Sequence, residues 1–234
     1  MGGAGPVCVF GVVVPYFEWG LAFRFSHLLL EGLKTTLLIS IVVMALGLVL
    51  GIFVAAGRLS KNPYINKSVA AYIEVFRGTP ALVQLVWFYY CLPIFLGISL
   101  PGFTAIVIAL TLNVAAFYGE AYRSGIQALQ KDQIDSADVL GLSYFQRLRY
   151  VVVPQAFRIV IPVLLSLSIS LFKDTSLVST LGIGDLMYQG RVIATETYRP
   201  IEILTSVAAM YFFIAFPVSL LTRRLELRLS RAYR

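Results

Sequence analysis

The chain has 234 residues, which is enough for one domain or one bundle of membrane-spanning helices. It is 59% hydrophobic and only 13% charged, whereas a soluble domain is normally about a quarter charged. This composition indicates a membrane protein. The formal net charge of +7 does not point to a nucleic-acid partner, because the basic residues cluster where apolar runs end, which is typical of residues that orient a membrane protein.

The sequence contains little of the chemistry that enzymes and metal sites require. His27 is the only histidine, and the two cysteines, Cys8 and Cys91, are too few and too far apart for a disulfide framework or a metal site. There is no phosphate-binding string of the form Gly-x-x-x-x-Gly-Lys-Ser/Thr. We therefore predict no catalytic residue, no metal and no cofactor in this chain. If its function uses ATP, a separate subunit must hydrolyse it.

Residues 1–32 form an N-terminal segment with few polar side chains. Pro6 and Pro15 interrupt it and glycines are frequent, so a regular spanning helix is not expected here. Trp19 and several phenylalanines lie near its end, and such aromatic residues favour the membrane–water interface. We predict an interfacial or loosely ordered arm.

The membrane domain is expected to cover residues 33–222, and its first span runs from Leu33 to about Ala56. Gly47 and Gly51 in this span have the spacing that lets a second helix approach closely. Three basic residues follow at once: Arg58, Lys61 and Lys67. By the positive-inside rule this end of the span is cytoplasmic, so the N-terminus is predicted to lie outside.

The second span is predicted to be broken. A partly amphipathic helix over 66–76 leads to Gly78, Thr79 and Pro80, and an apolar run follows from Ala81 to Leu96. Proline disfavours helix at the residue before it, so the helix should kink or end there, and freed backbone at membrane depth usually lines a cavity.

Two charged residues precede this break. Glu74 and Arg77 stand three residues apart and can pair on one helix face. Either they neutralise each other at the interface or they take part in gating; the sequence leaves both readings open.

Three further spans complete the pattern. They are expected at 103–118, at 159–172 with a continuation to Leu186, and at 203–221; the polar stretch 187–202 and the turn 97–102 are expected outside. Residues 223–234 form a basic tail that belongs in the cytoplasm. The charge bias predicts about five spans, with the N-terminus outside and the C-terminus inside.

The fourth predicted span contains unusual intramembrane chemistry. Lys173 and Asp174 follow an apolar run, and charged residues at such positions are costly and seldom face lipid. They can form a structural ion pair that fixes helix packing. Alternatively, together with the hydroxyls of Thr175 and Ser176, they can bind the carboxylate and ammonium groups of a zwitterionic amino acid.

The polar segment 132–156 is predicted to form two short helices that meet at a turn. Asp132 can cap the first helix, and Gly141 sits where a left-handed residue would end it. Ser143 and Gln146 have the spacing of a capping box for the second helix. An ordinary solvated helical hairpin would carry the same capping signals.

This segment resembles the cytoplasmic "EAA" loop of permease subunits in bacterial ABC importers. The Glu-Ala-Ala triplet corresponds to 135–137 (Asp-Ser-Ala), the following glycine to Gly141, and the final Ile-x-Leu-Pro to 151–154 (Val-Val-Val-Pro). The replacements keep charge or rough size. The resemblance implies a coupling loop over 124–156 that docks into an ATPase. Its implied coupling residues are Asp135, Ser136, Ala137, Asp138, Leu140, Gly141 and Pro154.

Two more strings are similar to amino-acid permeases of this kind. They are the Phe-Arg-Gly-Thr-Pro string at 76–80 with the following 82–85, and the Lys-Asp-Thr-Ser-Leu string at 173–177 with Asp185-Leu186 downstream. In that family the latter region lies beside the translocation path near the bilayer midplane. The candidate path residues are Lys173, Asp174, Thr175, Ser176, Glu74, Arg77 and Gln84.

The chain is thus identified as a member of the permease subunits of bacterial polar amino-acid ABC importers. This resemblance implies an all-α membrane protein of about five transmembrane helices with the type I importer (MetI-like) fold, in the inner membrane, with a periplasmic N-terminus and a cytoplasmic C-terminus. It implies amino-acid transport by alternating access. The implied partners are an ABC ATPase dimer that holds ATP and Mg²⁺, a second permease chain, identical or related, and a periplasmic or lipid-anchored solute-binding protein.

Other functions were weighed against this one. An importer of the same type could carry an opine, methionine or another small polar solute. A stand-alone secondary transporter would predict inverted repeats or paired broken helices, and only half of such a pattern is found. A scaffold protein would leave the intramembrane Lys173 and Asp174 without a reason.

Overall fold

The structure is a computed structural model that describes residues 7–9, 12–14, 19–129 and 139–231. The described chain is helical apart from one short hairpin, in which β1 (Val7–Val9) and β2 (Val12–Val14) pair antiparallel with Val7 opposite Val14. The helices, in chain order, are α1 (Trp19–Arg24), α2 (Ser26–Arg58), α3 (Pro63–Gly78), α4 (Ala81–Val86), the π-helical turn η1 (Trp87–Cys91), α5 (Leu92–Leu96), α6 (Gly102–Gln127), α8 (Tyr144–Arg147), the π-helical turn η2 (Leu148–Val152), α9 (Val153–Asp174), the 3-10 helix η3 (Thr175–Leu181), α10 (Leu186–Thr197) and α11 (Pro200–Arg231).

The predicted number of spans is confirmed. By length and composition, 4 helical segments can cross a membrane (26–58, 102–127, 145–181 and 200–228), or 5 if the bent pair formed by 63–78 and 81–96 counts as one span. The helices are longer than the apolar runs that predicted them, because hydropathy marks only their membrane-embedded part. Thus α2 begins at Ser26 rather than near residue 33, and α11 continues through the basic tail.

One prediction about the loops is wrong. The polar stretch after Leu186, expected to be an external loop, forms the helix α10. Asp185 starts this helix, since its carboxylate accepts hydrogen bonds from the backbone N–H groups of Met187 and Tyr188. The polar residues of α10 lie on the exposed face of a regular helix, and they do not indicate a loop.

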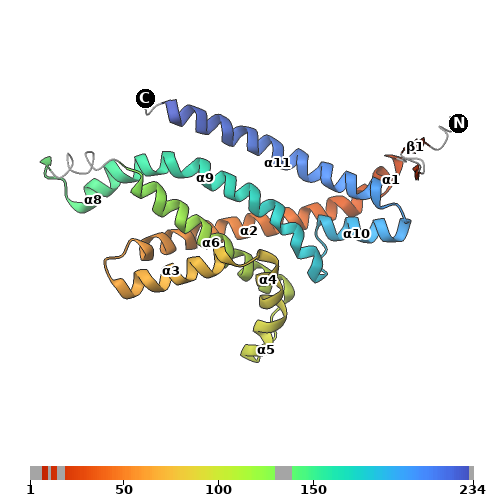
Figure 1. The fold of residues 1–234 in the computed structure, drawn as a ribbon, viewed down its shortest axis with the longest axis horizontal. Helices are drawn as coiled ribbons and strands as arrows, with labels where there is room; N and C mark the ends of the chain where they lie inside the picture. Colours follow the sequence, from red (N-terminus) through yellow and green to blue (C-terminus); the bar gives the residue numbers. More distant parts are fainter. Residues whose placement is uncertain (1–6, 10–11, 15–18, 130–138, 232–234) are drawn as a thin grey trace.

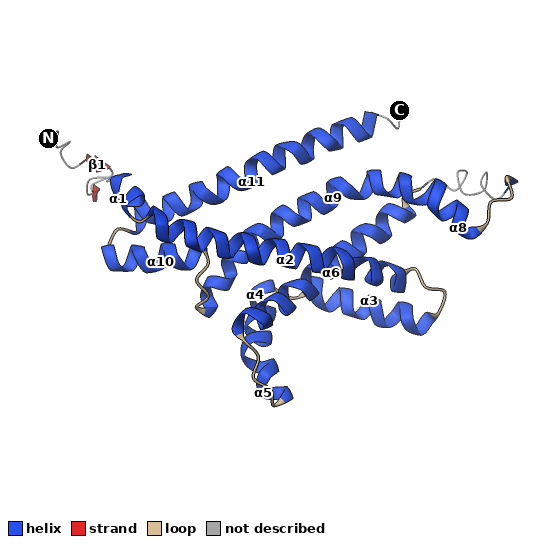
Figure 2. Cartoon of the chain, turned by 180° about the vertical axis from the view of Figure 1, so that it is seen from behind, coloured by secondary structure: helices blue, strands red, loops and turns tan. Residues whose placement is uncertain are grey.

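The long helices α2, α6, α9 and α11 form the body of the molecule, in which α6, α9 and α11 slope in a similar direction and α2 crosses α6 (Figure 1). Helix α6 packs against α2, α3 and α9, whereas α10 packs against α2 and α11. The segment α4–η1–α5 points away from this body in both views (Figures 1 and 2). The buried core has one large cluster around α6, which includes Ile39, Ile106 and Tyr118, and a second cluster that includes Leu186 and Ile203.

The predicted close approach of a helix to Gly47 and Gly51 is confirmed, and the approaching helix is α6. A Cβ atom placed on Gly47 would lie 2.4 Å from Cγ1 of Val114, and one on Gly51 would lie 2.8 Å from Cβ of Tyr118. Gly119 on α6 makes the contact reciprocal, because a Cβ there would meet Cγ1 of Val54 at 2.4 Å. Helices α2 and α6 therefore touch through glycine on both sides.

Candidate functional site

The predicted break in the second span is present, and the two halves meet at 105°. Pro80 has no N–H group, so the carbonyl oxygen of Phe76 lacks its usual helical partner four residues on. Side-chain amides replace that partner: Nε2 of Gln84 lies 2.9 Å from this oxygen and Nδ2 of Asn113 lies 3.2 Å from it. Gln84 also contacts the carbonyl and hydroxyl oxygens of Thr79, at 3.1 and 2.6 Å.

These amides join the break to α6. Asn113 donates to Oε1 of Gln84 at 2.9 Å, and Gln84 itself is only 8% exposed. On the neighbouring turn, the hydroxyl of Tyr72 on α3 donates to the backbone oxygen of Leu112. Sequence reasoning selected Gln84 but missed Asn113. The available signal was that Asn113 is the one amide side chain within the predicted third span.

A groove between α6 and α9 leads from this network to the predicted intramembrane carboxylate. Its cavity volume is about 160 Å³, and it is lined by Leu110, Asn113, Val114, Phe117, Leu167, Ser170, Leu171 and Asp174. Asp174 and Asn113 thus border the same space from opposite helices. The structure therefore brings Asp174 and Gln84 to one site, with Asn113 between them.

Arg77 contacts an aromatic residue that lines the groove. Its Cζ atom lies 5.3 Å from the centroid of Phe117, a cation–π contact, and Phe117 lines the groove. Glu74 and Arg77, both of which the structure describes, form no ion pair with each other. Glu74 is exposed on α3. In this structure the two side chains thus do not pair, and Arg77 contacts Phe117 instead.

Lys173 and Asp174 face different spaces. Lys173 lines a second cavity, of about 330 Å³, between α9 and α11 with Tyr211 and Phe212. Consecutive residues of a helix point about 100° apart, which accounts for the separation. No ion pair joins Lys173 to Asp174 in the described chain.

The two hydroxyl residues that follow are placed differently from each other. Thr175 is completely buried, and its hydroxyl donates to the carbonyl oxygen of Phe172 at 2.7 Å. Ser176 is partly buried. Neither lines the groove that contains Asp174.

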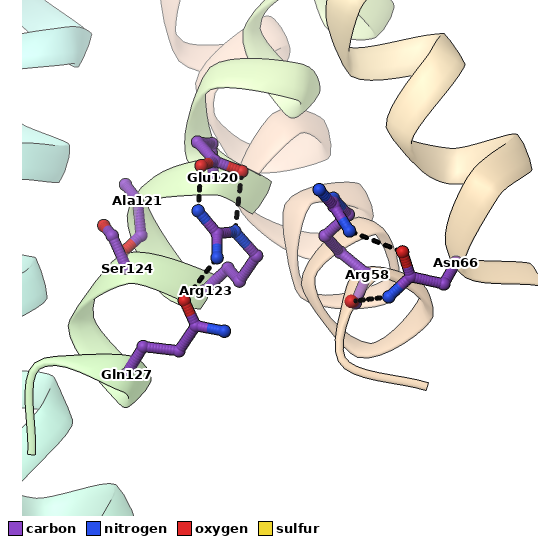
Figure 3. A network of polar contacts seen from close by, with 7 residues as sticks. All are labelled: Arg58, Asn66, Glu120, Ala121, Arg123, Ser124 and Gln127. Atoms are coloured by element: carbon purple, nitrogen blue, oxygen red, sulfur yellow. Dashed lines mark hydrogen bonds and ion pairs between the residues drawn. The ribbon is translucent and has the colours of Figure 1, made fainter. Parts of the chain in front are cut away.

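A charged network lies at the end of the bundle where α2 turns into α3 (Figure 3). On α6, Arg123 pairs with Glu120 and also bonds Gln127. Facing them, Arg58 and Asn66 exchange hydrogen bonds that close the turn between α2 and α3. This end is rich in positive charge, as the sequence predicted.

The predicted coupling loop is only partly described. Asp132, Asp135, Ser136, Ala137 and Asp138 lie outside the described residues. Beyond them, the two predicted capping features are confirmed. Gly141 has the left-handed φ of +70°, and Ser143 and Gln146 form a capping box with N–O distances of 2.9 and 3.4 Å.

The same loop exposes apolar side chains. Leu140 and Phe145 are each 78% exposed and Val139 is 88% exposed; we call these three residues the coupling patch. Pro154 stands in the first turn of α9, directly after the loop. A rigidly capped turn that presents exposed apolar side chains is suited to docking another protein.

Residues 47–231 match the family model described as the inner membrane component of binding-protein-dependent transport systems. The chain belongs to this family. Among its relatives, the permease is 36% identical to the glutamine transport system permease protein GlnP of Escherichia coli K12 over 215 residues, covering 92% of this chain and 98% of that protein. It is 33% identical to the glutamate/aspartate import permease protein GltK of Escherichia coli O6:H1, covering 91% and 98%. It is 35% identical to the probable glutamine ABC transporter permease GlnM of Bacillus subtilis, covering 87% and 94%.

Solved structures agree with the family. The permease superposes with a TM-score of 0.85 on a chain from the crystal structure of an amino acid ABC transporter with histidines, at 34% identity, covering 91% of the permease and 99% of that chain. The inward-facing MetNI methionine ABC transporter, at 21% identity and a TM-score of 0.69, shows the fold alone. The predicted family, the type I (MetI-like) fold and the inner-membrane location are confirmed.

Proposed function

We propose that this permease carries a polar amino acid through the groove between α6 and α9. The observation that supports this most directly is the position of Asp174, whose side chain borders the groove opposite Asn113. A carboxylate within a membrane span needs a partner, and the ammonium group of an amino acid supplies one. Several relatives are named as glutamine or glutamate permeases, which fits a cargo of this class.

The substrate's carboxylate requires a cation on the same path. Arg77 stands behind Phe117 at the groove, and Lys173 lies on the adjacent face of α9. We assign Asp174 to the substrate's ammonium group. Lys173 and Arg77 are the candidates for its carboxylate, each becoming accessible as the helices rock.

The orientation of the permease in the membrane determines where its partners are proposed to bind. The turn between α2 and α3, helix α8 and the last turns of α11 gather toward one end, and α10 and α1 lie toward the other (Figure 1). The first end carries the basic residues, so we place it in the cytoplasm and the other end in the periplasm. A second permease chain, identical or related, completes the pore, and a solute-binding protein delivers cargo from the periplasmic side.

The energy is supplied through the coupling segment 124–156. An ABC ATPase dimer that holds ATP and Mg²⁺ binds the coupling patch. Closure of the dimer pushes on this segment and rocks the helices between inward-open and outward-open states. Only a nucleotide or substrate with different affinities for the two states can drive the change.

The proposal is tested by purifying the tagged permease in detergent, identifying the subunits that accompany it and measuring ATP-dependent uptake in liposomes. We expect an ABC ATPase to co-purify and uptake of glutamine or glutamate to require ATP. Asp174→Asn should lower uptake about tenfold or more, because the charge-assisted bond is lost, while assembly persists. Glu226→Gln, an exposed carboxylate on α11, is the matched control.

Each other outcome has a definite meaning. Uptake of methionine or an opine instead would keep the importer and change its cargo. A permease that purifies alone and transports without ATP would establish a secondary transporter and contradict the proposal. Loss of expression in Asp174→Asn alone would assign that residue a structural role.

A further inference from the structure

A buried polar junction lies where α2, η3, α10 and α11 meet, outside the groove described above. Its centre is Asp185, which is completely buried. The carboxylate accepts the N–H groups of Tyr188 and Met187 at 3.0 and 3.3 Å and so caps α10. Capping groups usually lie at the surface, where water solvates the charge; this one has no such contact.

Helix α2 holds the start of α10 tightly. The hydroxyl of Thr36 donates to the Gly32 carbonyl at 3.1 Å and accepts the N–H of Leu186 at 3.0 Å. A Cβ atom on Gly32 would lie 2.8 Å from the Asp185 carbonyl oxygen, so only glycine permits this approach. At Gly32, α2 is therefore in direct contact with the backbone at the start of α10.

Helix α11 contributes a hydroxyl that is not satisfied. The buried Oη atom of Tyr211 lies beside the Asp185 carboxylate and the hydroxyls of Thr36 and Thr175. Within the part of the chain that the structure describes, it has no hydrogen-bond partner. Its ring packs on Phe172, with centroids 5.4 Å apart. A buried hydroxyl without a partner is costly, so its position beside a buried carboxylate is a distinctive feature of this junction.

Within the described part of the chain, no cation pairs with the Asp185 carboxylate. The charged groups nearest along the surrounding elements are the exposed pair Glu31–Lys34 on α2, the pair Arg199–Glu202 at the start of α11, the exposed Arg191 and Glu196 on α10, and the exposed Lys173 and Asp174 at the end of α9. The other charges of α2 and α11 lie farther along these helices, at Arg58, Arg223, Arg224, Glu226 and Arg228. An uncompensated buried carboxylate favours the protonated form.

The junction is linked by backbone to the transport groove. Thr175 follows Asp174 directly, and the 3-10 helix η3 connects it to Gly182, whose φ is +76°. A 3-10 stretch between α-helices often marks a hinge. A movement of the groove residues on α9 therefore reaches Asp185 through seven residues of η3 and a short turn.

We propose that Asp185 is a positioning residue for transport, which holds α10 against α2 and α11 in a closed junction and exchanges a proton with the periplasm when the junction opens. Its burial in the closed junction favours the protonated carboxyl, and hydration in the open junction favours the carboxylate. Proton uptake therefore stabilises closure. The use of uptake as a readout rests on the proposed function; the opening of the junction does not.

The direction of the pH dependence follows from the carboxyl group. Burial raises the pKa of Asp185 from 3.8 to about 6, although its bonds to Tyr188 and Met187 and the nearby Tyr211 hydroxyl act in the opposite direction. Closure is thus fully favoured below the ordinary value and loses that advantage as the pH rises to about 6. A difference of about two pKa units changes the ratio of open to closed junctions about 100-fold.

The test uses the complete permease complex in liposomes, with Cys8 and Cys91 replaced by serine and Leu186→Cys as a reporter. Leu186 is completely buried, so the rate of its alkylation reports opening of the junction. We expect this rate to increase by up to about 100-fold between about pH 4 and 6, beyond the change seen for the exposed control Thr195→Cys. Asp185→Asn should abolish the increase in alkylation rate beyond that of the control, and it should make amino-acid uptake less dependent on pH.

Tyr211→Phe provides a second, milder variant. It removes a group that lowers the pKa of Asp185. The midpoint of the rise in alkylation rate with pH should therefore move to higher pH. The same midpoint in Tyr211→Phe as in the parent, or the same excess pH dependence in Asp185→Asn, would overturn the proposal. A normal alkylation profile in a complex that does not import amino acids would instead refute the proposed function and leave the proton exchange standing.

Discussion

Gln84 and Asn113 show how single residues make a broken helix possible within the membrane. Pro80 has no N–H group to donate, so the Phe76 carbonyl has to find another partner. The two amides provide it and bond each other at 2.9 Å. The bend is therefore held by side chains rather than by the backbone on either side of it.

We expect Gln84→Leu to destabilise the permease by about 1–3 kcal/mol, because the substitution keeps the approximate size but removes the hydrogen bonds that the buried Gln84 amide makes to Thr79 and Asn113. Thermal unfolding in detergent measures the loss. Val83→Leu, which changes a neighbouring residue that is 58% exposed, is the control. Equal melting temperatures for the two variants would show that the amide network does not hold the bend.

At this scale the sequence predicted the break but not its partners. Pro80 acts on its own chain segment, so its effect is readable locally. Asn113 lies 37 residues from Phe76, and no local pattern connects them. Likewise, the sequence selected Lys173 and Asp174 together, whereas only the positions of α6 and α11 decide which cavity each side chain enters.

At the scale of elements, the contact between α2 and α6 is made by glycines. Because Gly47, Gly51 and Gly119 carry no side chain, the two helix backbones come close enough for many small contacts, which replace the hydrophobic effect as a driving force within lipid. The pattern of small residues predicted such a contact. It did not name α6, because glycine spacing specifies a surface and not the helix that covers it.

Gly51→Ala should therefore lower the stability of the permease by about 1–3 kcal/mol, although alanine is the better helix former. The added Cβ would lie 2.8 Å from Cβ of Tyr118 and 3.2 Å from the backbone nitrogen of Gly119, so α6 has to shift. The same substitution at Gly20, which has nothing within 4 Å, is the matched control. Unfolding in detergent should separate the two; a Gly51→Ala variant as stable as Gly20→Ala would contradict glycine-mediated packing.

The pattern of polar residues predicted the helix α3 correctly but failed to predict the helix α10. The amphipathic stretch before the break predicted a helix, and α3 is present with Asn62 as its cap and Pro63 in its first turn. The polar stretch that forms α10 was predicted to be a loop, because its surface position was mistaken for irregular structure. Its start was signalled by Asp185, a good capping residue directly before a run without proline or glycine until Gly190.

For the whole molecule, the proposed function assigns transport and coupling to two different regions of the permease. The groove bordered by Asp174 lies along α6 and α9, and both helices lead to the end that carries the coupling patch (Figures 1 and 2). Helix α9 begins at Val153, within the proposed coupling segment 124–156, so the push that we propose on this segment would act directly on a wall of the groove. The family resemblance was readable because glycine, proline and capping residues are local. The groove was not, because it exists only between helices.

Leu140→Asp tests this arrangement. Leu140 is 78% exposed, so the permease should fold and insert normally, whereas a charge in the centre of an apolar contact should weaken ATPase binding about tenfold or more. Co-purification of the ATPase measures this binding, and ATP-dependent uptake should fall with it. Tyr198→Asp makes a similar change at a residue that is 90% exposed near the end of α10 and should leave the ATPase bound. Undiminished co-purification with Leu140→Asp would show that the ATPase binds elsewhere, and the push on α9 would then lose its physical basis.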